Sequence, residues 1–404
     1  MNTGRHRLAA GGRPGSPLGV ILVEGFLSRL AFGIISFALP LYAHSLGMSL
    51  AAIGVLLSTN LAVAVALKPA LGWVVDRFGV RSAYVAAVAL RTLALLLLVF
   101  AAAPWQLFAL RGLHGVAIAL RDPAAATVLA GLGGSGAVAQ RFAWYQTAKT
   151  VAGAGGRFAA GLLLTLLLGA YPPVFLVACA LSALPFGLVI WRLRGSAVAE
   201  LRLPPRAPDD PPPAHTQRAL RPYAVLGFLT AGTAYLMANL LPVLAVDYMG
   251  LSPAAAGSVY AVSAAVALTG PLWGWISDHR SHRLVLCMRA VGNVSSSLIW
   301  LLSPTYAGLL AGKAADDVGK AAFRPAWGAL MAHVAADDPR RRARSLSRLS
   351  AAEDLGEMSG PIVAGLVWSL WGLPALLILR IGLALATEGF ALRLDHRAAP
   401  GPIP

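Results

Sequence analysis

Charged residues are scarce in this sequence. Only 12% of its 404 residues are Asp, Glu, Lys or Arg, whereas 57% are hydrophobic. Soluble domains carry roughly 25% charged residues, so folding in water would leave too much apolar surface exposed. Acidic residues are scarcer still, with 17 Asp and Glu against 33 Lys and Arg. These shortages exclude an ordinary soluble domain and favour a chain that folds in a lipid bilayer.

Cysteine is also scarce, and the familiar catalytic patterns are missing. Cys179 and Cys287 are the only cysteines, and both lie inside apolar runs, which excludes a disulfide framework. The sequence contains no Cys/His zinc spacing, HExxH, GxSxG or P-loop. We therefore expect no metal, no cofactor, no ATP drive and no enzyme activity, since His114 stands alone without a nucleophile or a metal cluster.

Long apolar runs, by contrast, follow one another along the whole chain. A spanning helix needs about 20 residues. The sequence predicts twelve spans, at 18–43, 50–74, 83–103, 106–129, 145–169, 173–192, 222–246, 253–276, 284–302, 305–332, 346–370 and 373–393. The corresponding domains are an N-terminal tail (1–17), a first bundle (18–194), a Pro-rich semi-extended linker (195–221), a second bundle (222–394) and a C-terminal tail (395–404).

Basic residues cluster in alternate loops between these runs. Arg77 and Arg81 follow the second span and Arg340, Arg341 and Arg342 follow the tenth, whereas the intervening loops hold almost no Arg or Lys. By the positive-inside rule, both termini are cytoplasmic and the number of spans is even. This pattern accounts for the net charge of +16 without nucleic acid. We expect a multi-pass protein of a bacterial inner membrane.

The two halves repeat each other at a constant offset of 202 residues. Leu39-Pro40 corresponds to Leu241-Pro242. The segment 69–76 corresponds to 271–278, and 111–123 corresponds to 313–325, at the same offset. Chance apolar similarity would not keep Pro, Gly, Trp and Asp in register over this distance. The chain is therefore predicted to be a tandem duplication of two parallel halves.

The most specific motif follows the second span and recurs after the eighth. Its residues are Gly72, Asp76, Arg77, Gly79 and Arg81, with Gly274, Asp278 and Arg283 in the second copy. The first copy resembles the GxxxDRxGxR loop of the major facilitator superfamily. That resemblance implies an all-α polytopic fold of two pseudo-symmetric six-helix bundles that transports solutes by alternating access. It also implies that these loops gate the cytoplasmic side.

Two further motifs are similar to patterns of the same family. Arg111 and His114 occupy an RxxQG-like pattern in which the family's arginine serves proton coupling or substrate binding. Residues 356–365 look like the GxxxGPxxGG motif that efflux antiporters carry in helix 5, although here the motif lies in the second half. Its residues, expected to pack helices closely, are Gly356, Gly360, Pro361 and Gly365. In the first half Arg157 stands where that motif has proline.

Ionisable residues at membrane depth are the candidates for function. The proton-coupling or substrate candidates are Glu24, Arg29, Arg111, His114, Arg157, Asp316, Asp317, Glu353 and Glu357. Lys313, Asp316, Asp317 and Lys320 share one helix face and are expected to pair. Glu353 and Glu357 lie one turn apart and could carry protons or belong to a structural ion-pair network. Arg91 is expected to be a scaffold residue.

The sequence thus favours a monomeric secondary transporter that is driven by protons and exports a small organic solute. Its expected partners are the lipid bilayer, a small-molecule substrate and protons. Uptake of an organic anion is the first alternative, because Arg29, Arg91, Arg111 and Arg157 would suit a carboxylate or phosphate. A non-transporting scaffold or sensor, with the Pro-rich linker as its partner site, is the second alternative.

Overall fold

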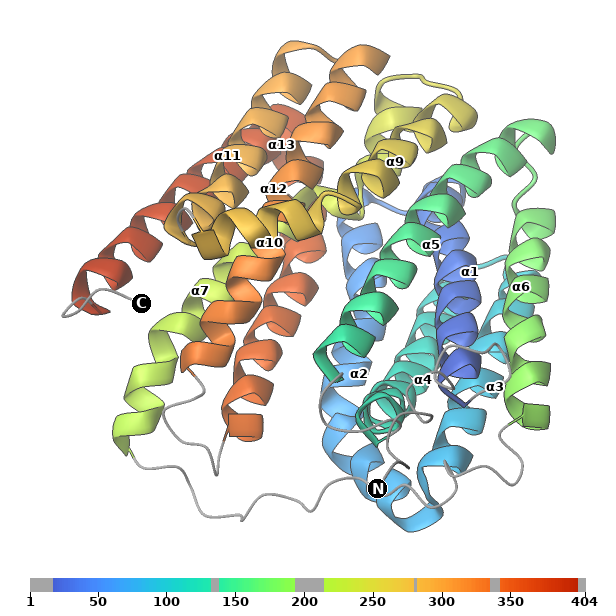
Figure 1. The fold of residues 1–404 in the computed structure, drawn as a ribbon. Coiled ribbons are helices and arrows are strands. Elements are labelled where there is room, and N and C mark those ends of the chain that lie inside the picture. Colours follow the sequence, from blue (N-terminus) through green and yellow to red (C-terminus); the bar gives the residue numbers. More distant parts are fainter. Residues whose placement is uncertain (1–16, 132–137, 193–213, 280–281, 335–341, 399–404) are drawn as a thin grey trace, which may run out of the picture. The chain divides into compact units, whose positions relative to one another are not determined.

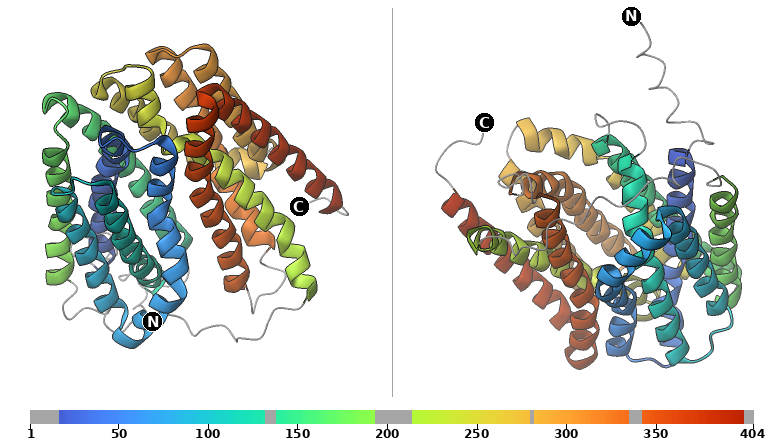
Figure 2. Two further views of the ribbon diagram at one scale, coloured as in Figure 1. Left: turned by 180° about the vertical axis from the view of Figure 1, so that it is seen from behind. Right: turned by 90° about the horizontal axis from the view of Figure 1, so that it is seen from below.

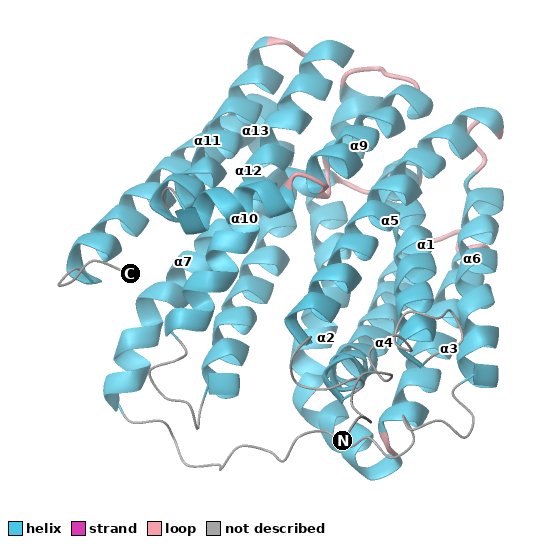
Figure 3. Cartoon of the chain, in the orientation of Figure 1, coloured by secondary structure: helices cyan, strands magenta, loops and turns pink. Residues whose placement is uncertain are grey.

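A computed structural model describes residues 17–131, 138–192, 214–279, 282–334 and 342–398. Every regular element in these ranges is a helix, as the uniform cyan of Figure 3 shows. This agrees with the apolar runs of the sequence, because a helix satisfies its own backbone hydrogen bonds where lipid offers none.

The first half of the chain forms six helices, coloured blue to green in Figure 1. They are α1 (Pro17–Ser45), α2 (Leu50–Phe78), α3 (Val80–Leu98), α4 (Pro104–Gly131), α5 (Val138–Leu166) and α6 (Tyr171–Arg192). Each corresponds to one predicted span. The turn between α2 and α3 is made by Gly79, whose φ of 84° favours glycine.

Most of these helices belong to one compact unit. Unit 1 comprises Met1–Gly47, Thr59–Arg206 and Ser252–Ala261. Within it, α1 packs against α5 and α6, and α3 packs against α4 and α6. The packed interior includes Tyr84, Val88 and Leu120, all buried. This arrangement brings polar side chains of α1, α3, α4 and α5 together inside one bundle.

The second half contains more breaks than the sequence predicts. Its elements are α7 (Ala214–Ala238), α8 (Leu241–Val243), the π-helix η3 (Leu244–Tyr248), α9 (Pro253–Ala267), α10 (Gly270–His279), α11 (His282–Leu302), α12 (Tyr306–Val334) and α13 (Arg342–Ala398). The predicted span 253–276 is divided into α9 and α10. Pro271 supplies the reason, because it has no N–H to continue the helical ladder.

Helices α7 and α13 also differ from the predicted spans. Helix α7 begins at Ala214, so residues 214–221 are helical where a semi-extended linker was expected. The cause is that no proline lies between Ala214 and Arg221, and Pro222 lies inside the helix. Helix α13 joins the last two predicted spans and is interrupted at Gly372, whose φ is 81°. Figure 2 shows its two arms in red, joined at one end.

The second compact unit contains most of these elements. Unit 2 comprises Met48–Ser58, Ala207–Leu251 and Val262–Pro404. Helix α7 packs against α13, α11 packs against α12 and α13, and α10 packs against α12. Buried polar residues of this unit include Arg289, Asn293, Asp316 and Arg380.

Large apolar side chains remain exposed on many helices, as a bilayer solvent permits. Phe100, Leu302 and Leu385 are exposed by 71%, 78% and 58%. By length and hydropathy alone, six helical stretches within the described ranges could cross a membrane. They are Leu22–Ser45, Leu50–Lys68, Val80–Leu98, Tyr171–Trp191, Leu220–Tyr248 and Leu346–Leu394. Helices α4 and α12 are not among these six, and both carry several ionisable residues at membrane depth.

Candidate functional site

A buried carboxylate organises the polar interior of unit 1. Glu24 on α1 is fully buried and pairs with Arg91 of α3 at 3.1 Å and with Arg121 of α4 at 2.9 Å. The hydroxyls of Ser28 and Tyr84 also donate hydrogen bonds to this carboxylate. A buried carboxylate needs such partners, because its transfer out of water is otherwise too costly. One negative charge thus meets two arginines, which leaves an excess of positive charge.

Next to this cluster lies a cavity of about 140 Å³ inside unit 1. Its lining comes from α1, α3, α4 and α5 and is mostly basic and small. The basic lining residues are Arg29, Arg91, His114, Arg121 and Lys149, and the acidic one is Asp122. Because Asp122 is half exposed and Glu24 is already paired, the cavity lining carries more positive than negative charge.

Three flat side chains stack along this cavity. The Arg29 guanidinium carbon lies 4.9 Å from the centre of the Phe32 ring, and Phe32 stacks on His114 at 5.3 Å with a 10° interplanar angle. All three residues line the cavity. Gly153 of α5 makes room for Arg29, since a Cβ there would lie 3.2 Å from the Arg29 Nε. The structure therefore brings the predicted residues Arg29 and His114 to one wall.

The two other predicted basic residues of the first half lie elsewhere in unit 1. Arg111 is buried and donates a hydrogen bond to the side-chain oxygen of Asn60. Arg157 donates to the Ser36 hydroxyl at 3.1 Å and lies over the Tyr260 ring at 5.2 Å. Neither residue lines the cavity described above.

Unit 2 has its own buried carboxylate, which comes from a different helix. Asp316 of α12 pairs with Arg289 of α11 at 3.3 Å, with Lys320 at 2.7 Å and with Arg380 of α13 at 2.7 Å. Arg380 is fully buried and also donates to the Asn293 side-chain oxygen at 2.8 Å. This ion network ties three helices of unit 2 together.

The expected pairing along one face of α12 is confirmed. Lys313 pairs with Asp317, and Lys320 pairs with Asp316. Asp317 also accepts a hydrogen bond from the Ser263 hydroxyl at 2.5 Å. Both aspartates are buried, and the paired cations offset the cost of removing the carboxylates from water.

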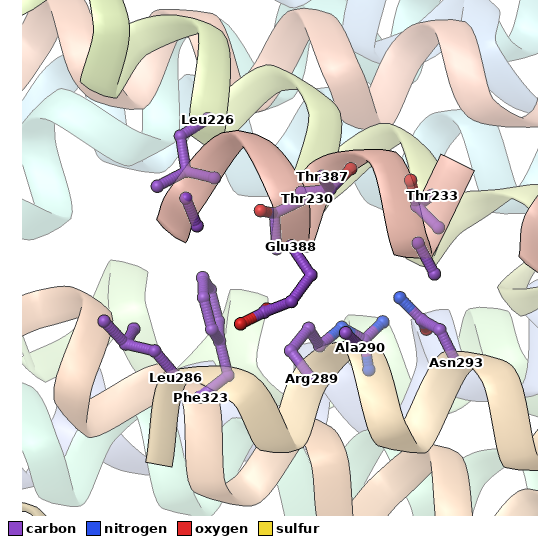
Figure 4. A pocket seen from close by; sticks show the side chains of 12 residues that line it. Leu226, Thr230, Thr233, Leu286, Arg289, Ala290, Asn293, Phe323, Thr387 and Glu388 are labelled. Carbon is purple, nitrogen blue, oxygen red and sulfur yellow. The ribbon is translucent and has the colours of Figure 1, made fainter. Parts of the chain in front are cut away.

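A second cavity, of about 40 Å³, lies inside unit 2 between α7, α11, α12 and α13. Figure 4 shows Arg289 and Glu388 reaching into it from two different helices. Glu388 accepts a hydrogen bond from the Cys287 thiol at 2.7 Å. The Nη2 atom of Arg289 is buried and has no hydrogen-bond partner among the described residues. The cavity is polar at this end and has room for about one or two waters.

This second cavity corresponds to the Glu24 cluster through the internal duplication. At the offset of 202 residues, Leu226 matches Glu24 and Phe323 matches Arg121, and both Leu226 and Phe323 line the cavity. The position that holds a carboxylate in the first half is therefore apolar in the second. The halves share backbone landmarks and differ in their buried charges.

Helix α13 carries the last two acidic candidates, Glu353 and Glu357, which are both partly buried. A Cβ added to Gly227 of α7 would lie 3.3 Å from the Glu353 Cγ and 3.1 Å from the ring of Trp327. Glu353 thus packs beside α7 and α12. Neither Glu353 nor Glu357 lines either of the two cavities.

The gating-motif residues lie at the ends of helices. Gly79 turns the chain between α2 and α3, and its N–H donates to the Val75 carbonyl at 2.8 Å. Arg77 is exposed, Arg81 is partly buried and Gly274 lies within α10. The structure does not describe the surroundings of four motif residues, which are Gly72, Asp76, Asp278 and Arg283.

The helix-packing motif of α13 makes close contacts within unit 2. A Cβ on Gly356 would lie 2.2 Å from the Phe228 carbonyl oxygen, and one on Gly360 would lie 2.8 Å from Tyr235. A Cβ on Gly365 would lie 2.2 Å from the Leu50 carbonyl oxygen. The Pro361 carbonyl oxygen faces Gly54 in the same way, at 2.2 Å from its added Cβ.

Sequence reasoning missed Arg121 and Arg289, both of which hold a buried carboxylate. Arg121 lies in the second half of its predicted span, 106–129. A signal was nevertheless present, because Arg111, His114, Ile118 and Arg121 recur at the spacing of one helix face. Arg91, expected to be a scaffold residue, both pairs with Glu24 and lines the cavity.

Among the described residues, no group of three or more His, Cys, Asp or Glu side chains is placed to hold a metal ion. The arrangement in unit 1 is instead that of a binding cavity. Its lining contains Arg29, Arg91, Arg121 and Lys149 together with Phe32 and His114, and the buried Glu24 pairs with two of these arginines.

Known structures share this fold over nearly the whole chain. The nucleoside transporter NupG is 13% identical, with a TM-score of 0.74, covering 93% of this chain and 98% of its own. A bacterial homologue of the human lysosomal transporter Spinster is 16% identical, with a TM-score of 0.72, covering 94% and 96%. The human organic anion transporter MFSD10 is 17% identical, with a TM-score of 0.65, covering 92% and 98%.

No curated protein sequence matches the chain. The sequence model of the Major Facilitator Superfamily, however, matches residues 21–312 and again residues 224–403. These overlapping matches cover most of both halves, and the similar structures are transporters of the same fold. The family moves solutes across lipid bilayers, and the fold is that of a multi-pass membrane protein. This chain belongs to the Major Facilitator Superfamily.

Proposed function

We propose that this chain moves a small anionic solute across the membrane by alternating access. The observation that supports it is the basic cavity of unit 1, of about 140 Å³, which is lined by Arg29, Arg91, Arg121 and Lys149. Glu24 is already bound by two of these arginines. The cavity therefore has more positive than negative charge before any solute binds.

Several cations gathered at membrane depth are costly, and an incoming anion relieves that cost. Arg91 offers a specific donor, because its buried Nη2 atom has no hydrogen-bond partner among the described residues. Guanidinium groups bind carboxylates and phosphates in two-point geometry. The name of one similar structure, the human organic anion transporter MFSD10, accords with this class of solute, although its likeness is one of fold.

The test compares solutes that differ only in charge. Purified protein in proteoliposomes is offered benzoate and benzamide, and lactate and lactamide, and both uptake and release are measured. The protein is expected to move the carboxylates across the membrane and not the amides. Arg29→Gln and Lys149→Gln should each lower the apparent affinity for a carboxylate by roughly ten- to hundredfold, because a charge-assisted hydrogen bond is lost.

Lys68→Gln is the control, since Lys68 is a basic residue of α2 that does not line the cavity. Equal movement of carboxylates and their amides would contradict an anionic solute. Measuring release as well as uptake also tests the export direction that the sequence favoured.

We also propose that transport is coupled to protons and that Glu388 carries the proton. The sequence favoured Glu24, Asp316, Glu353 or Glu357. Glu24 and Asp316 are each held by at least two cations, which favours their permanent ionisation. Glu388 instead faces a cavity, accepts a thiol hydrogen bond and forms no ion pair with a described residue. A proton can therefore bind there without breaking a salt bridge.

Glu388→Gln should remove the dependence of transport on an imposed pH gradient while solute binding persists. Glu353→Gln is the comparison, because Glu353 lies on the same helix and lines neither cavity. If the Glu353 variant loses the dependence and the Glu388 variant keeps it, the carrier is Glu353. Transport that ignores the gradient in the unmodified protein would contradict coupling altogether.

We also propose a bacterial inner-membrane location with both termini cytoplasmic, on the evidence of the basic loops. The segments 72–81 and 274–283 would then gate the cytoplasmic side. Single cysteines placed at Arg77 and at Trp371 test this orientation. Only the first should be protected from an impermeant thiol reagent applied outside intact cells, and labelling of both to equal extent would contradict the topology.

A further inference from the structure

The cavity of unit 1 has features that select more than charge. Its volume of about 140 Å³ is close to the roughly 150 Å³ of an apolar protein cavity that holds one benzene molecule. Its lining includes the small residues Gly25, Ala87 and Ala117, from three different helices. A single six-membered ring fits this space.

The polar groups of the cavity are divided between two kinds of contact. Arg29, Phe32 and His114 form the planar stack, with Phe32 in contact with both of the others. Arg91, Arg121 and Lys149 supply the cations next to it. Aromatic rings and guanidinium planes bind a further flat ring through its face or edge. A tetrahedral anion would use the cations and gain nothing from the stack.

We infer that the solute bound in this cavity is a planar aromatic carboxylate of about the size of benzoate. The ring lies against the stack of Arg29, Phe32 and His114, and the carboxylate accepts hydrogen bonds from the nearby cations. The excess positive charge selects the anion, and the stack selects the ring. This inference rests on the proposed function, because it names the class of anion that the same site takes.

The experiment measures the binding of four probes to detergent-purified full-length protein by thermal shift and calorimetry. The probes are benzoate, cyclohexanecarboxylate, benzamide and inorganic phosphate. Benzoate and cyclohexanecarboxylate share charge and approximate size and differ in planarity. Benzoate should bind roughly two- to tenfold more tightly, which is the range that aromatic pairs contribute. Benzamide and phosphate should bind much more weakly than benzoate.

Phe32→Leu should reduce the preference for benzoate over cyclohexanecarboxylate to near unity while both carboxylates still bind. Phe26→Leu is the matched control, because Phe26 lies on the same helix, is 38% exposed and does not line the cavity. It should keep the preference unchanged. A preference that survives Phe32→Leu would overturn the role of the stack.

The other outcomes separate the two proposals. Equal binding of benzoate and cyclohexanecarboxylate, with no binding of benzamide, overturns the aromatic inference and leaves the anionic solute standing. Equal binding of benzoate and benzamide overturns the anionic solute. Stronger binding of phosphate than of benzoate overturns the aromatic inference in favour of a tetrahedral anion. Binding of none of the four probes contradicts both proposals.

Discussion

Two arginines pair with the buried carboxylate of Glu24. Replacing this carboxylate by an amide of the same shape would leave Arg91 without an acidic partner and Arg121 with only the more distant, half-exposed Asp122. Breaking a buried ion pair by removing one partner typically costs about 3–5 kcal/mol. We predict that Glu24→Gln lowers the free energy of unfolding by about 3 kcal/mol or more, measured by chemical denaturation in detergent.

Asp122→Asn provides the comparison for this prediction. Asp122 pairs with the same Arg121, but at 3.8 Å, and its side chain is 49% exposed. Exposed ion pairs contribute at most about 1 kcal/mol, so the variant should unfold almost as the unmodified protein does. Equal losses from the two variants would show that Glu24 is not the counter-charge that holds the cluster.

Arg29 can be displaced without altering its own charge. A Cβ on Gly153 would lie 3.2 Å from the Arg29 Nε, and its three nearest neighbours would all be atoms of the Arg29 side chain. Gly153→Ala should therefore shift the guanidinium from the cavity wall and weaken carboxylate binding several-fold, with little change in stability. Gly155→Ala is the control on the same helix, because its Cβ would meet Leu30 at an ordinary 3.7 Å. Equal affinities in the two variants would remove Arg29 from the site.

At this scale the sequence predicts which residues are unusual but not which of them meet. Glu24, Arg29 and His114 stand out because charged or titratable groups are costly in a span, and the structure gathers them around one cavity. Arg157 stands out equally and lies with Tyr260 instead. Arg121 was passed over, because position within a span does not reveal whether an arginine reaches water or an inward-facing carboxylate.

Among the elements, α13 and α7 approach each other closely at a small residue. Gly356 approaches the Phe228 carbonyl so closely that an added Cβ would lie 2.2 Å away. A backbone oxygen cannot move aside as a flexible side chain can, so Gly356→Ala must separate the two helices. We predict a loss of about 1–3 kcal/mol of unfolding free energy, the usual cost of overpacking.

Gly382→Ala on the same element is the matched control. Nothing lies within 4 Å of a Cβ at Gly382, so the substitution should be neutral or stabilising by up to about 1 kcal/mol through helix propensity. Equal stability of the Gly356 and Gly382 variants would contradict a tight α7–α13 contact at Gly356.

Element boundaries followed from the sequence wherever glycine or proline set them. The turns at Gly79 and Gly372 fall where the sequence predicts the ends of spans, because both positions have a positive φ that glycine adopts at low cost. The break before Pro271 and the early start of α7 at Ala214 were not predicted. Apolar periodicity shows that a segment can span a membrane, whereas it does not show where its ladder of hydrogen bonds is interrupted.

The whole molecule is a duplication in which backbone landmarks are kept and buried charges are not. Leu226 occupies the position of Glu24 in the second copy and lines a polar cavity with Arg289 and Glu388. A carboxylate placed at Leu226 would therefore find a guanidinium that still has an unused donor, the buried Nη2 of Arg289. The opposing effect is repulsion from the carboxylate of Glu388 in the same cavity (Figure 4).

We predict that Leu226→Glu alone destabilises the protein, and that adding Glu388→Gln recovers much of the loss, since the double variant moves one carboxylate from α13 to α7. The measurement is the unfolding free energy of both single variants and the double variant, from which the coupling energy follows.

Leu240→Glu is the control, a fully buried leucine of the same half that does not line the cavity. Glu388→Gln should not rescue it. Because the rescue requires that the two residues share one cavity, purely additive losses in the Leu226 pair would contradict the correspondence between the halves. A positive coupling would show that either copy of the ancestral bundle can hold its counter-charge on the first helix.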